Sequence, residues 1–397
     1  MPIVGLVCGV GRVTSCSTTG TKGSTMSKLR KRFFWEALYA LVLVMLCGCM
    51  GAVESRDGVP IGQAVDALEA RSQRARIAAG AFHTLAITTE GEVWAWGKNN
   101  RGQLGNGTIV SSSTPVKFQP QSPLLDERVI AVATGHSHSI ALTSGGAVLA
   151  WGDNEYSQLG SPGFPGAFNA APQSVPLLGG VTAVAASTHH SLALTADGKV
   201  WAWGLNVNGQ LGDCTTIIRA QPVTVKTAPN AELNNVIAIA AGSAHSMALT
   251  ADGNVYTWGG NGFGQLGDGT LNGRACAAVV PSWSPTNGKA VDVVAGHVHS
   301  MTLMSNGDIY SWGQNTYGQL GHGNFTQSSV PAKVTTVADA KAIGAGYFHS
   351  FAILANGNAV AWGYNYYQQL GDGTSGSSPY AVGVSGVTGV MAVTGGL

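Results

Sequence analysis

Six histidines recur at nearly constant spacing through most of this 397-residue chain. The steps between them are 55, 52, 55, 54 and 50 residues, and Ser or Thr follows each one: His83, His138, His190, His245, His299 and His349. Imidazole is a common metal ligand, so a metal ring is one interpretation. One histidine per repeat would be spread around a wide ring, not gathered within about 2 Å of one ion. We therefore expect backbone-bonding histidines, with no metal and no cofactor.

Two other side chains keep the same phase. Trp precedes Gly once per repeat, at Trp96, Trp151, Trp203, Trp258, Trp312 and Trp362. Gln precedes Leu-Gly once per repeat, at Gln103, Gln158, Gln210, Gln265, Gln319 and Gln369. A Trp buries up to about 250 Å² and can use its N–H to satisfy a neighbour. The pattern favours Trp as the core of each repeat and Gln as a loop staple that bonds backbone groups.

Short strands must position these residues, and the third repeat shows how. Apolar strand-like runs cover residues 181–186, 190–195, 199–204 and 222–225. Asp197-Gly198 between the second and third runs is a strong hairpin signal, and Pro222 is expected at a strand start, where its missing N–H does least harm. Each repeat is thus predicted to be a four-stranded antiparallel meander.

One such sheet cannot hide both of its faces from water. Sheets stacked around an axis cover one another and leave only short edges, which is the architecture of a β-propeller. The composition agrees with short strands and tight turns, because Gly accounts for 56 residues and charged residues for only 10%.

These residues together form the pattern G-x-x-H-[ST]-x-A-L-T-x-[DN]-G-x-V-[WY]-x-W-G-x-N-x-x-G-Q-L-G, from Ile77 onward. The pattern resembles the repeat of the regulator of chromosome condensation family, in a bacterial, exported member. The resemblance implies an all-β propeller, usually of seven blades. Six repeats are complete, and residues 387–395 open a seventh, aligned with residues 291–296 of the fifth. We expect a truncated seventh blade with incomplete closure; a closed six-bladed ring is the alternative.

The N-terminal part is expected to be a targeting segment. Lys28 to Arg32 are basic except for Leu29, and an apolar run broken only by Glu36 follows, which is typical of a secretory signal. The run ends at Cys49, which resembles a bacterial lipidation site. A cleaved signal without a lipid and an uncleaved membrane anchor are the alternatives.

These observations divide the chain into four parts. The first is expected to be an extension ahead of the true start, and the second the signal sequence, with the lipoprotein type as one form of it. A linker and the propeller follow; the bounds of the four parts are 1–25, 26–49, 50–75 and 76–397. All readings of the signal place the propeller at the cell envelope or outside the cell. Cys214 and Cys276 fall in equivalent linkers and could pair there. Spacing alone does not show that their Cα atoms come close enough for a disulfide, and two separate thiols are the alternative.

The repeats disagree most in the loop before Gln-Leu-Gly. The residue two places before Gln is Arg101, Tyr156, Asn208, Phe263, Tyr317 or Tyr367, and Tyr364 and Tyr366 lie close by. Loops on a rigid scaffold often carry function, and aromatic residues are enriched in binding hot spots. We therefore expect a partner-binding rim, with Trp283 as a further exposed anchor. The alternative is that these rings pack on the next blade.

The function expected from the sequence is a non-enzymatic, monomeric protein-interaction scaffold. From Met50 onward the chain has 15 Lys and Arg and 19 Asp and Glu, which gives a net charge of −4. A negative charge does not suit a duplex-DNA binder. Guanine-nucleotide exchange on a small GTPase, the role of the family's founder, is one alternative. An envelope enzyme that acts on a glycan is another, although no carboxylate pair stands out from the repeat. The sequence does not identify the protein partner.

Overall fold

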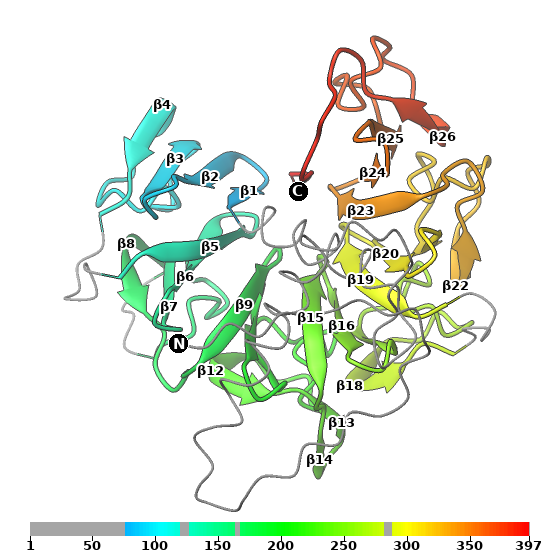
Figure 1. Ribbon diagram of the computed structural model, residues 1–397. Helices are drawn as coiled ribbons and strands as arrows, with labels where there is room; N and C mark the ends of the chain where they lie inside the picture. Colours follow the sequence, from blue (N-terminus) through cyan, green and yellow to red (C-terminus); the bar gives the residue numbers. More distant parts are fainter. Residues whose placement is uncertain (1–75, 120–126, 163–166, 282–287, 397) are drawn as a thin grey trace, which may run out of the picture. The chain divides into compact units, whose positions relative to one another are not determined.

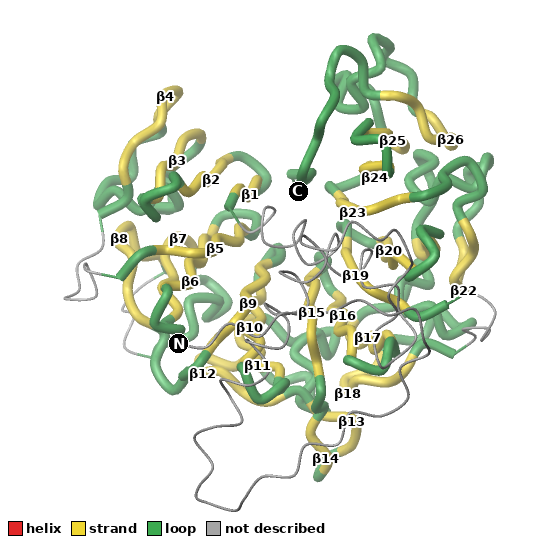
Figure 2. The backbone as a smooth tube through the Cα atoms, viewed as in Figure 1, coloured by secondary structure: helices red, strands yellow, loops and turns green. Residues whose placement is uncertain are grey.

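The structure is a computed structural model that describes residues 76–119, 127–162, 167–281 and 288–396. These residues form strands, turns and loops, and Figure 2 shows no helix among them. Several predicted segments and sites lie outside this part of the chain: residues 1–25, 26–49 and 50–75, Cys49 and Trp283. No helix able to span a bilayer is found in the described ranges.

The described chain forms six four-stranded antiparallel sheets, here called blades 1 to 6 (Figure 1). Blade 1 comprises β1 (Ile77–Ala79), β2 (His83–Ile87), β3 (Val93–Gly97) and β4 (Ser112–Lys117). Blade 2 comprises β5 (Val129–Thr134), β6 (His138–Thr143), β7 (Val148–Asp153) and β8 (Phe168–Ser174). Blade 3 comprises β9 (Val181–Ala186), β10 (His190–Thr195), β11 (Val200–Gly204) and β12 (Arg219–Thr224).

The other three blades repeat this plan. Blade 4 comprises β15 (Val236–Ala241), β16 (His245–Thr250), β17 (Val255–Gly259) and β18 (Arg274–Val279). Blade 5 comprises β19 (Ala290–Ala295), β20 (His299–Met304), β21 (Ile309–Gly313) and β22 (Ser328–Lys333). Blade 6 comprises β23 (Ala340–Ala345), β24 (His349–Leu354), β25 (Ala359–Gly363) and β26 (Ser378–Gly383). A small hairpin between blades 3 and 4 is formed by β13 (Lys226–Ala228) and β14 (Ala231–Glu232).

The strands of blade 3 follow the sequence prediction with one correction. The outer strand β12 begins at Arg219, so Pro222 lies inside it and not at its start. β12 is the edge strand of its sheet, and an edge strand tolerates a proline whose missing N–H would face away from the sheet.

Glycines fix the backbone at two recurrent points. In the predicted Asp-Gly hairpin of blade 3, Gly198 has φ 79° and donates its N–H to the carbonyl of Thr195 at 2.9 Å. The Gly of each Trp-Gly pair has a positive φ, as at Gly259 with 106°, and it ends the third strand in every blade except blade 2, where β7 continues to Asp153. A Cβ at Gly259 would meet the carbonyl of Ala244, so only glycine fits there without strain.

The blades pack side by side around a central space (Figure 1). Their inner strands contact one another in the order β1, β5, β9, β15, β19 and β23. Between blades 3 and 4, Trp258 is fully buried against Leu192, Leu211 and Val225. The Trp of blades 2, 3, 5 and 6 are equally buried, whereas Trp96 of blade 1 is only half-buried. The prediction of an all-β propeller of four-stranded blades is confirmed.

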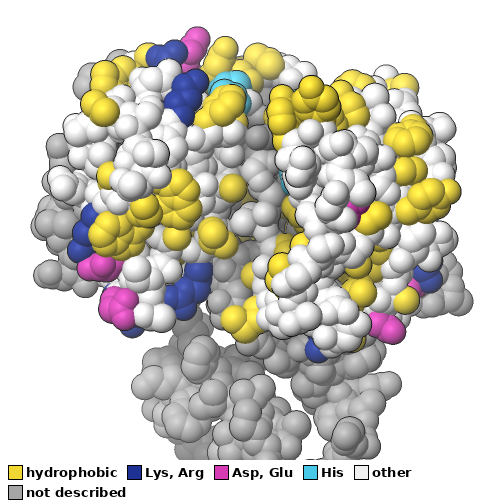
Figure 3. Space-filling model, turned by 90° about the horizontal axis from the view of Figure 1, so that it is seen from above, with side chains coloured by type: hydrophobic (Ala, Val, Ile, Leu, Met, Phe, Trp, Pro, Cys, Tyr) yellow, Lys and Arg dark blue, Asp and Glu magenta, His cyan; other side chains and the backbone are white. Residues whose placement is uncertain are grey.

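The predicted start of a seventh blade does not form a strand. The last strand of the described chain is β26, and residues 390–396 are irregular. They lie between blades 6 and 1: Val390 and Val393 pack on Ala342 and Ile353, and Gly396 lies against Gly80. A strand needs a neighbouring strand to pair its backbone hydrogen bonds. Within the described residues, no second strand of a seventh blade follows this segment to provide one. Figure 3 shows the furrow between blades 1 and 6.

A recurring hydrogen-bonded set, here called the blade junction, joins each blade to the next. At the junction of blades 3 and 4, His190 Nε2 lies 2.8 Å from Ser246 Oγ. Ser246 Oγ donates to the backbone carbonyl of Gln210 at 2.9 Å, and Trp258 Nε1 donates to the same carbonyl at 2.9 Å. The same contacts join blades 1 and 2, 2 and 3, 4 and 5, and 5 and 6.

The junction corrects the role expected for the histidines. The Nε2 atoms of five of the six histidines bond a side-chain hydroxyl of the next blade and not backbone groups. Because the serine uses its single proton on the glutamine carbonyl, the histidine must donate from Nε2, and its Nδ1 carries no proton. The expected role of Gln is confirmed: Gln210 Oε1 accepts the N–H of Asn208 at 2.9 Å.

Candidate functional site: the loop face

Two sets of loops lie on the same face of the propeller, here called the loop face. In an antiparallel meander, the link between strands one and two and the link between strands three and four leave from the same edge. The contact between Tyr317 of a β21–β22 loop and Phe348 of the β23–β24 link, with ring centroids 5.1 Å apart, agrees with this. The predicted rim residues and the residues just before the junction histidines therefore share one surface.

Each Gln-Leu-Gly loop is held rigid from inside. In blade 5, Gln319 Oε1 accepts the N–H of Tyr317 at 2.9 Å, and Asn315 Oδ1 accepts the N–H of Leu320 at 2.9 Å. The side-chain amide of Asn315 also donates to the carbonyls of Asn324 and Thr326. The side chain of the residue two places before Gln thus projects from a fixed backbone.

Seven rings on blades 5 and 6 form one continuous cluster, here called the aromatic row. Its members are His297, Tyr347, Phe348, Tyr317, Tyr364, Tyr366 and Tyr367. His297 stacks on Tyr347 with centroids 3.7 Å apart, and Tyr317 lies 4.8 Å from Tyr364. Tyr366 and Tyr367 stand almost perpendicular, at 87°, with centroids 5.1 Å apart.

The outer end of the row is open to solvent. Tyr366 is 68% exposed and Tyr367 is 77% exposed, whereas Tyr317 and Phe348 are half-buried. Packing on a neighbouring blade therefore accounts for the inner rings but not for the outer two. Partial desolvation, with the nearby Tyr367, raises the pKa of the Tyr364 phenol, so it stays protonated at neutral pH.

The remaining predicted rim residues lie elsewhere on the loop face. Arg101 Nε is 3.7 Å from Asp153 Oδ1, and burial raises the pKa of that carboxyl. Tyr156 meets the ring of His189 at 4.8 Å, and Phe263 is 39% exposed in the loop of blade 4. The structure therefore brings together Tyr317, Tyr364 and Tyr367 and leaves Arg101, Tyr156 and Phe263 apart from them.

Sequence reasoning missed the inner part of the row. His297, Tyr347 and Phe348 lie one or two places before a junction histidine. The other repeats carry mixed residues there, from Ser243 and Ala244 in blade 4 to Phe82, His136 and His189 in blades 1 to 3. The signal in the sequence was the adjacent pair Tyr347-Phe348, because each of the other repeats carries at most one ring at these two positions. The cluster can be recognised only once the fold is known, because the link between the first and second strand of each blade lies on the same face as the Gln-Leu-Gly loops.

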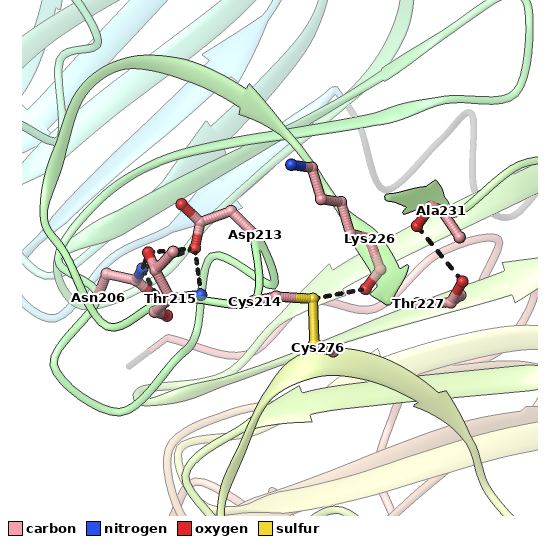
Figure 4. The surroundings of a disulfide bond; sticks show 8 residues. All are labelled: Asn206, Asp213, Cys214, Thr215, Lys226, Thr227, Ala231 and Cys276. Carbon is pink, nitrogen blue, oxygen red and sulfur yellow. Dashed lines mark hydrogen bonds between the residues drawn. A yellow bond between two sulfur atoms is a disulfide. The ribbon is translucent and has the colours of Figure 1, made fainter. Parts of the chain in front are cut away.

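A disulfide ties the loop of blade 3 to blade 4 (Figure 4). Cys214 and Cys276 are joined with their Cα atoms 4.3 Å apart. Beside the disulfide, the N–H of Cys214 donates to the carbonyl of Ala275 at 2.8 Å. Asp213 receives a charge-assisted bond from Arg219 at 2.7 Å. This cross-link restrains the same face of the propeller that carries the row.

The described residues contain no group of three or more His, Cys, Asp or Glu able to hold a metal ion. Burial lowers the pKa of four junction histidines to about 3: His83, His190, His245 and His299. The inner strands enclose a cavity of about 610 Å³ lined mainly by Ala, Val and Ile. The junction serines and histidines are buried, and each serine donates its proton to a backbone carbonyl, as Ser246 does to Gln210.

The meander blades, their junctions and the loop face define a protein of the β-propeller class. Within it, the chain belongs to the family of RCC1-like domains, because the model of that domain matches residues 45–397. The resemblance to the regulator of chromosome condensation family is thereby confirmed.

The chain is 34% identical over 258 residues to the ultraviolet-B receptor UVR8 of Arabidopsis thaliana, covering 64% of this chain and 56% of the receptor. It is 32% identical over 346 residues to the E3 ubiquitin-protein ligase HERC2 of Homo sapiens, covering 79% of this chain but 7% of the ligase. The chain thus spans about half the length of the first relative and a small part of the second.

Two solved structures are similar over most of this chain. Prp20p from Saccharomyces cerevisiae has a TM-score of 0.70 and 29% identity, covering 81% of this chain and 80% of Prp20p. Human WBSCR16 has a TM-score of 0.72 and 24% identity, covering 81% and 84%. The second likeness concerns the fold alone.

Proposed function

We propose that this chain is a non-enzymatic scaffold that binds a protein partner through the aromatic row. One observation carries the proposal: Tyr366 and Tyr367 are 68% and 77% exposed on a loop whose backbone is fixed from inside. Rigid, exposed tyrosines lose little conformational entropy on binding and are frequent hot spots. Arg101, Tyr156, Phe263 and Trp283 remain proposed as further contacts for a large partner.

The test compares partner capture by matched variants. The full chain is immobilised and exposed to an envelope extract, and retained proteins are identified by mass spectrometry. Tyr317→Ala with Tyr367→Ala should lose a partner that the unchanged chain retains. Tyr380→Ala is the control, because Tyr380 is 52% exposed on β26 of the same blade but outside the row. Equal capture by all three proteins would refute the proposal.

The proposed location is the envelope of a bacterium or the space outside the cell, with the protein monomeric. The proposal is supported by the basic-then-apolar pattern before Cys49 and by the disulfide, a bond that persists in oxidising compartments. Lipidation at Cys49 is expected to direct radiolabelled palmitate into the chain. Incorporation that is unchanged in Cys49→Ser would exclude that site.

A second candidate function is guanine-nucleotide exchange on a small GTPase, which the family resemblance implies. The likeness to Prp20p, whose structure was reported with its binding to Gsp1p and histones, favours keeping it. Accelerated release of a labelled guanine nucleotide from a small GTPase would support this candidate over a purely binding role.

The finer architecture is also a proposal. We infer that residues 387–396 mark the position of a seventh blade, because they lie between blades 6 and 1 and the family implies seven. The buried imidazole of His349 supports this: unlike the other five histidines, it has no junction serine within the described residues.

A further inference from the structure

We propose that the aromatic row binds a proline-rich segment of the partner in the polyproline II conformation. The inference rests on the proposed function, because it names the kind of partner segment that the same surface would take. Three features carry it: the absence of charge, the free hydroxyl donors and the arrangement of the rings.

The surface around the row is uncharged. The four segments that supply it, residues 295–298, 314–321, 345–348 and 364–371, contain no Lys, Arg, Asp or Glu. Burial lowers the pKa of His297 to about 4, so this ring is neutral at pH 7. Charged groups of the loop face, such as Arg101 and Asp153, sit on blades 1 and 2 instead. Recognition by charge pairing with an acidic, basic or phosphorylated peptide therefore does not suit this surface.

The row offers hydrogen-bond donors that its own fold does not use. Within the described residues, the hydroxyls of four row tyrosines make no hydrogen bond: Tyr317, Tyr364, Tyr366 and Tyr367. A polyproline II segment has no internal hydrogen bonds, so all of its carbonyls are open acceptors. Tyrosine donors and proline carbonyls are complementary, because proline itself contributes no N–H.

The ring arrangement suits flat pyrrolidine rings. The ring plane of Tyr367 makes an angle of 75° with that of Tyr364 and 87° with that of Tyr366. The ring faces therefore meet nearly at right angles, and a flat ring can pack between them. Neighbouring outer rings lie 5.1 to 6.5 Å apart, comparable to the advance of about 6 Å made by two residues of polyproline II. A preformed polyproline helix docks on aromatic-lined surfaces at low entropic cost.

The direct test titrates acetylated decaproline into the full chain and follows binding by calorimetry. The expected result is saturable binding that weakens by about tenfold or more in Tyr367→Ala. Tyr367→Phe, which removes only the hydroxyl, should weaken binding less, and Tyr380→Ala should leave it unchanged. A thermal unfolding curve checks that each variant is folded; Tyr367 is exposed enough that truncation should not alter it.

Three results would overturn the inference: no binding of decaproline, equal binding by Tyr367→Ala, or binding of a hexamer of N-acetylglucosamine in its place. The last would assign the row to glycans. If decaproline fails while partner capture still depends on Tyr317 and Tyr367, only the inference is lost. If capture is also insensitive to both tyrosines, the proposed function fails with it.

Discussion

Mild acid should unfold this protein through its junction histidines. For four of them, His83, His190, His245 and His299, the pKa of about 3 in the folded state lies well below the value of 6.5 for an exposed imidazole. The cause is burial, reinforced by geometry: a second proton would go to Nδ1, which has no hydrogen-bond partner at His83, His138, His245 and His299. The unfolded chain therefore binds more protons than the folded chain at any pH between these two values, and acid favours unfolding.

The size of the effect follows from this difference. Stability from these groups is complete above pH 6.5 and is lost as the pH falls toward 3. At pH 5 each unfolded imidazole gains about 2 kcal/mol from protonation, because one pH unit corresponds to about 1.4 kcal/mol. Four histidines together remove about 8 kcal/mol, which is comparable to the whole stability of a typical domain, about 5–15 kcal/mol. The pKa values of Asp213 and Asp252 are lowered from 3.8, so the stability that these carboxylates contribute is lost only as the pH falls below about 3.8 and not between pH 6.5 and 5.

Urea unfolding followed by tryptophan fluorescence measures the prediction, because the junction Trp are buried only in the folded state. The free energy of unfolding should fall steeply between pH 6.5 and 5. In His245→Gln the slope should decrease by about 1.4 kcal/mol per pH unit, since one titrating group is gone. His136→Gln is the control, because His136 is more exposed than the junction histidines and its pKa is less strongly lowered. A flat pH dependence, or an unchanged slope in His245→Gln, would refute the reasoning.

Two further predictions concern what holds neighbouring blades together. Ser246→Ala leaves the buried Nε2 of His190 without its partner and should lower the free energy of unfolding, measured in urea, by about 1–3 kcal/mol. Thr84→Ala is the control: it changes the same position of blade 1, where no junction forms in the described chain, and should lower that free energy much less. Cys276→Ser opens a cross-link between residues 62 apart and should lower the free energy of unfolding by about 4 kcal/mol. A reducing agent should lower the stability of the unchanged protein by a similar amount and leave that of the variant unaffected.

The sequence was sufficient for the blade but not for the contacts between blades. Within a repeat, the Asp-Gly turns and apolar runs place strands correctly, as at β9 and β10. The blade junction could not be predicted, because its partners are far apart in the sequence. His190 bonds Ser246 of the next blade, and no pattern inside one repeat reveals that pairing. Residues 387–395 also match the pattern of a first strand. A first strand forms only when a second strand lies beside it, which periodicity alone cannot show.

The same division explains why the aromatic row lies to one side of the propeller axis. Junction residues must stay nearly identical in every blade, because each one satisfies a buried group in its neighbour. Residues of the loop face are free of that demand, so the face can differ from blade to blade. The row lies at blades 5 and 6, where Tyr347 and Phe348 stand side by side before one junction histidine and the loop of blade 6 carries Tyr366 and Tyr367. A partner that uses the row must therefore sit over these two blades and not over the central cavity.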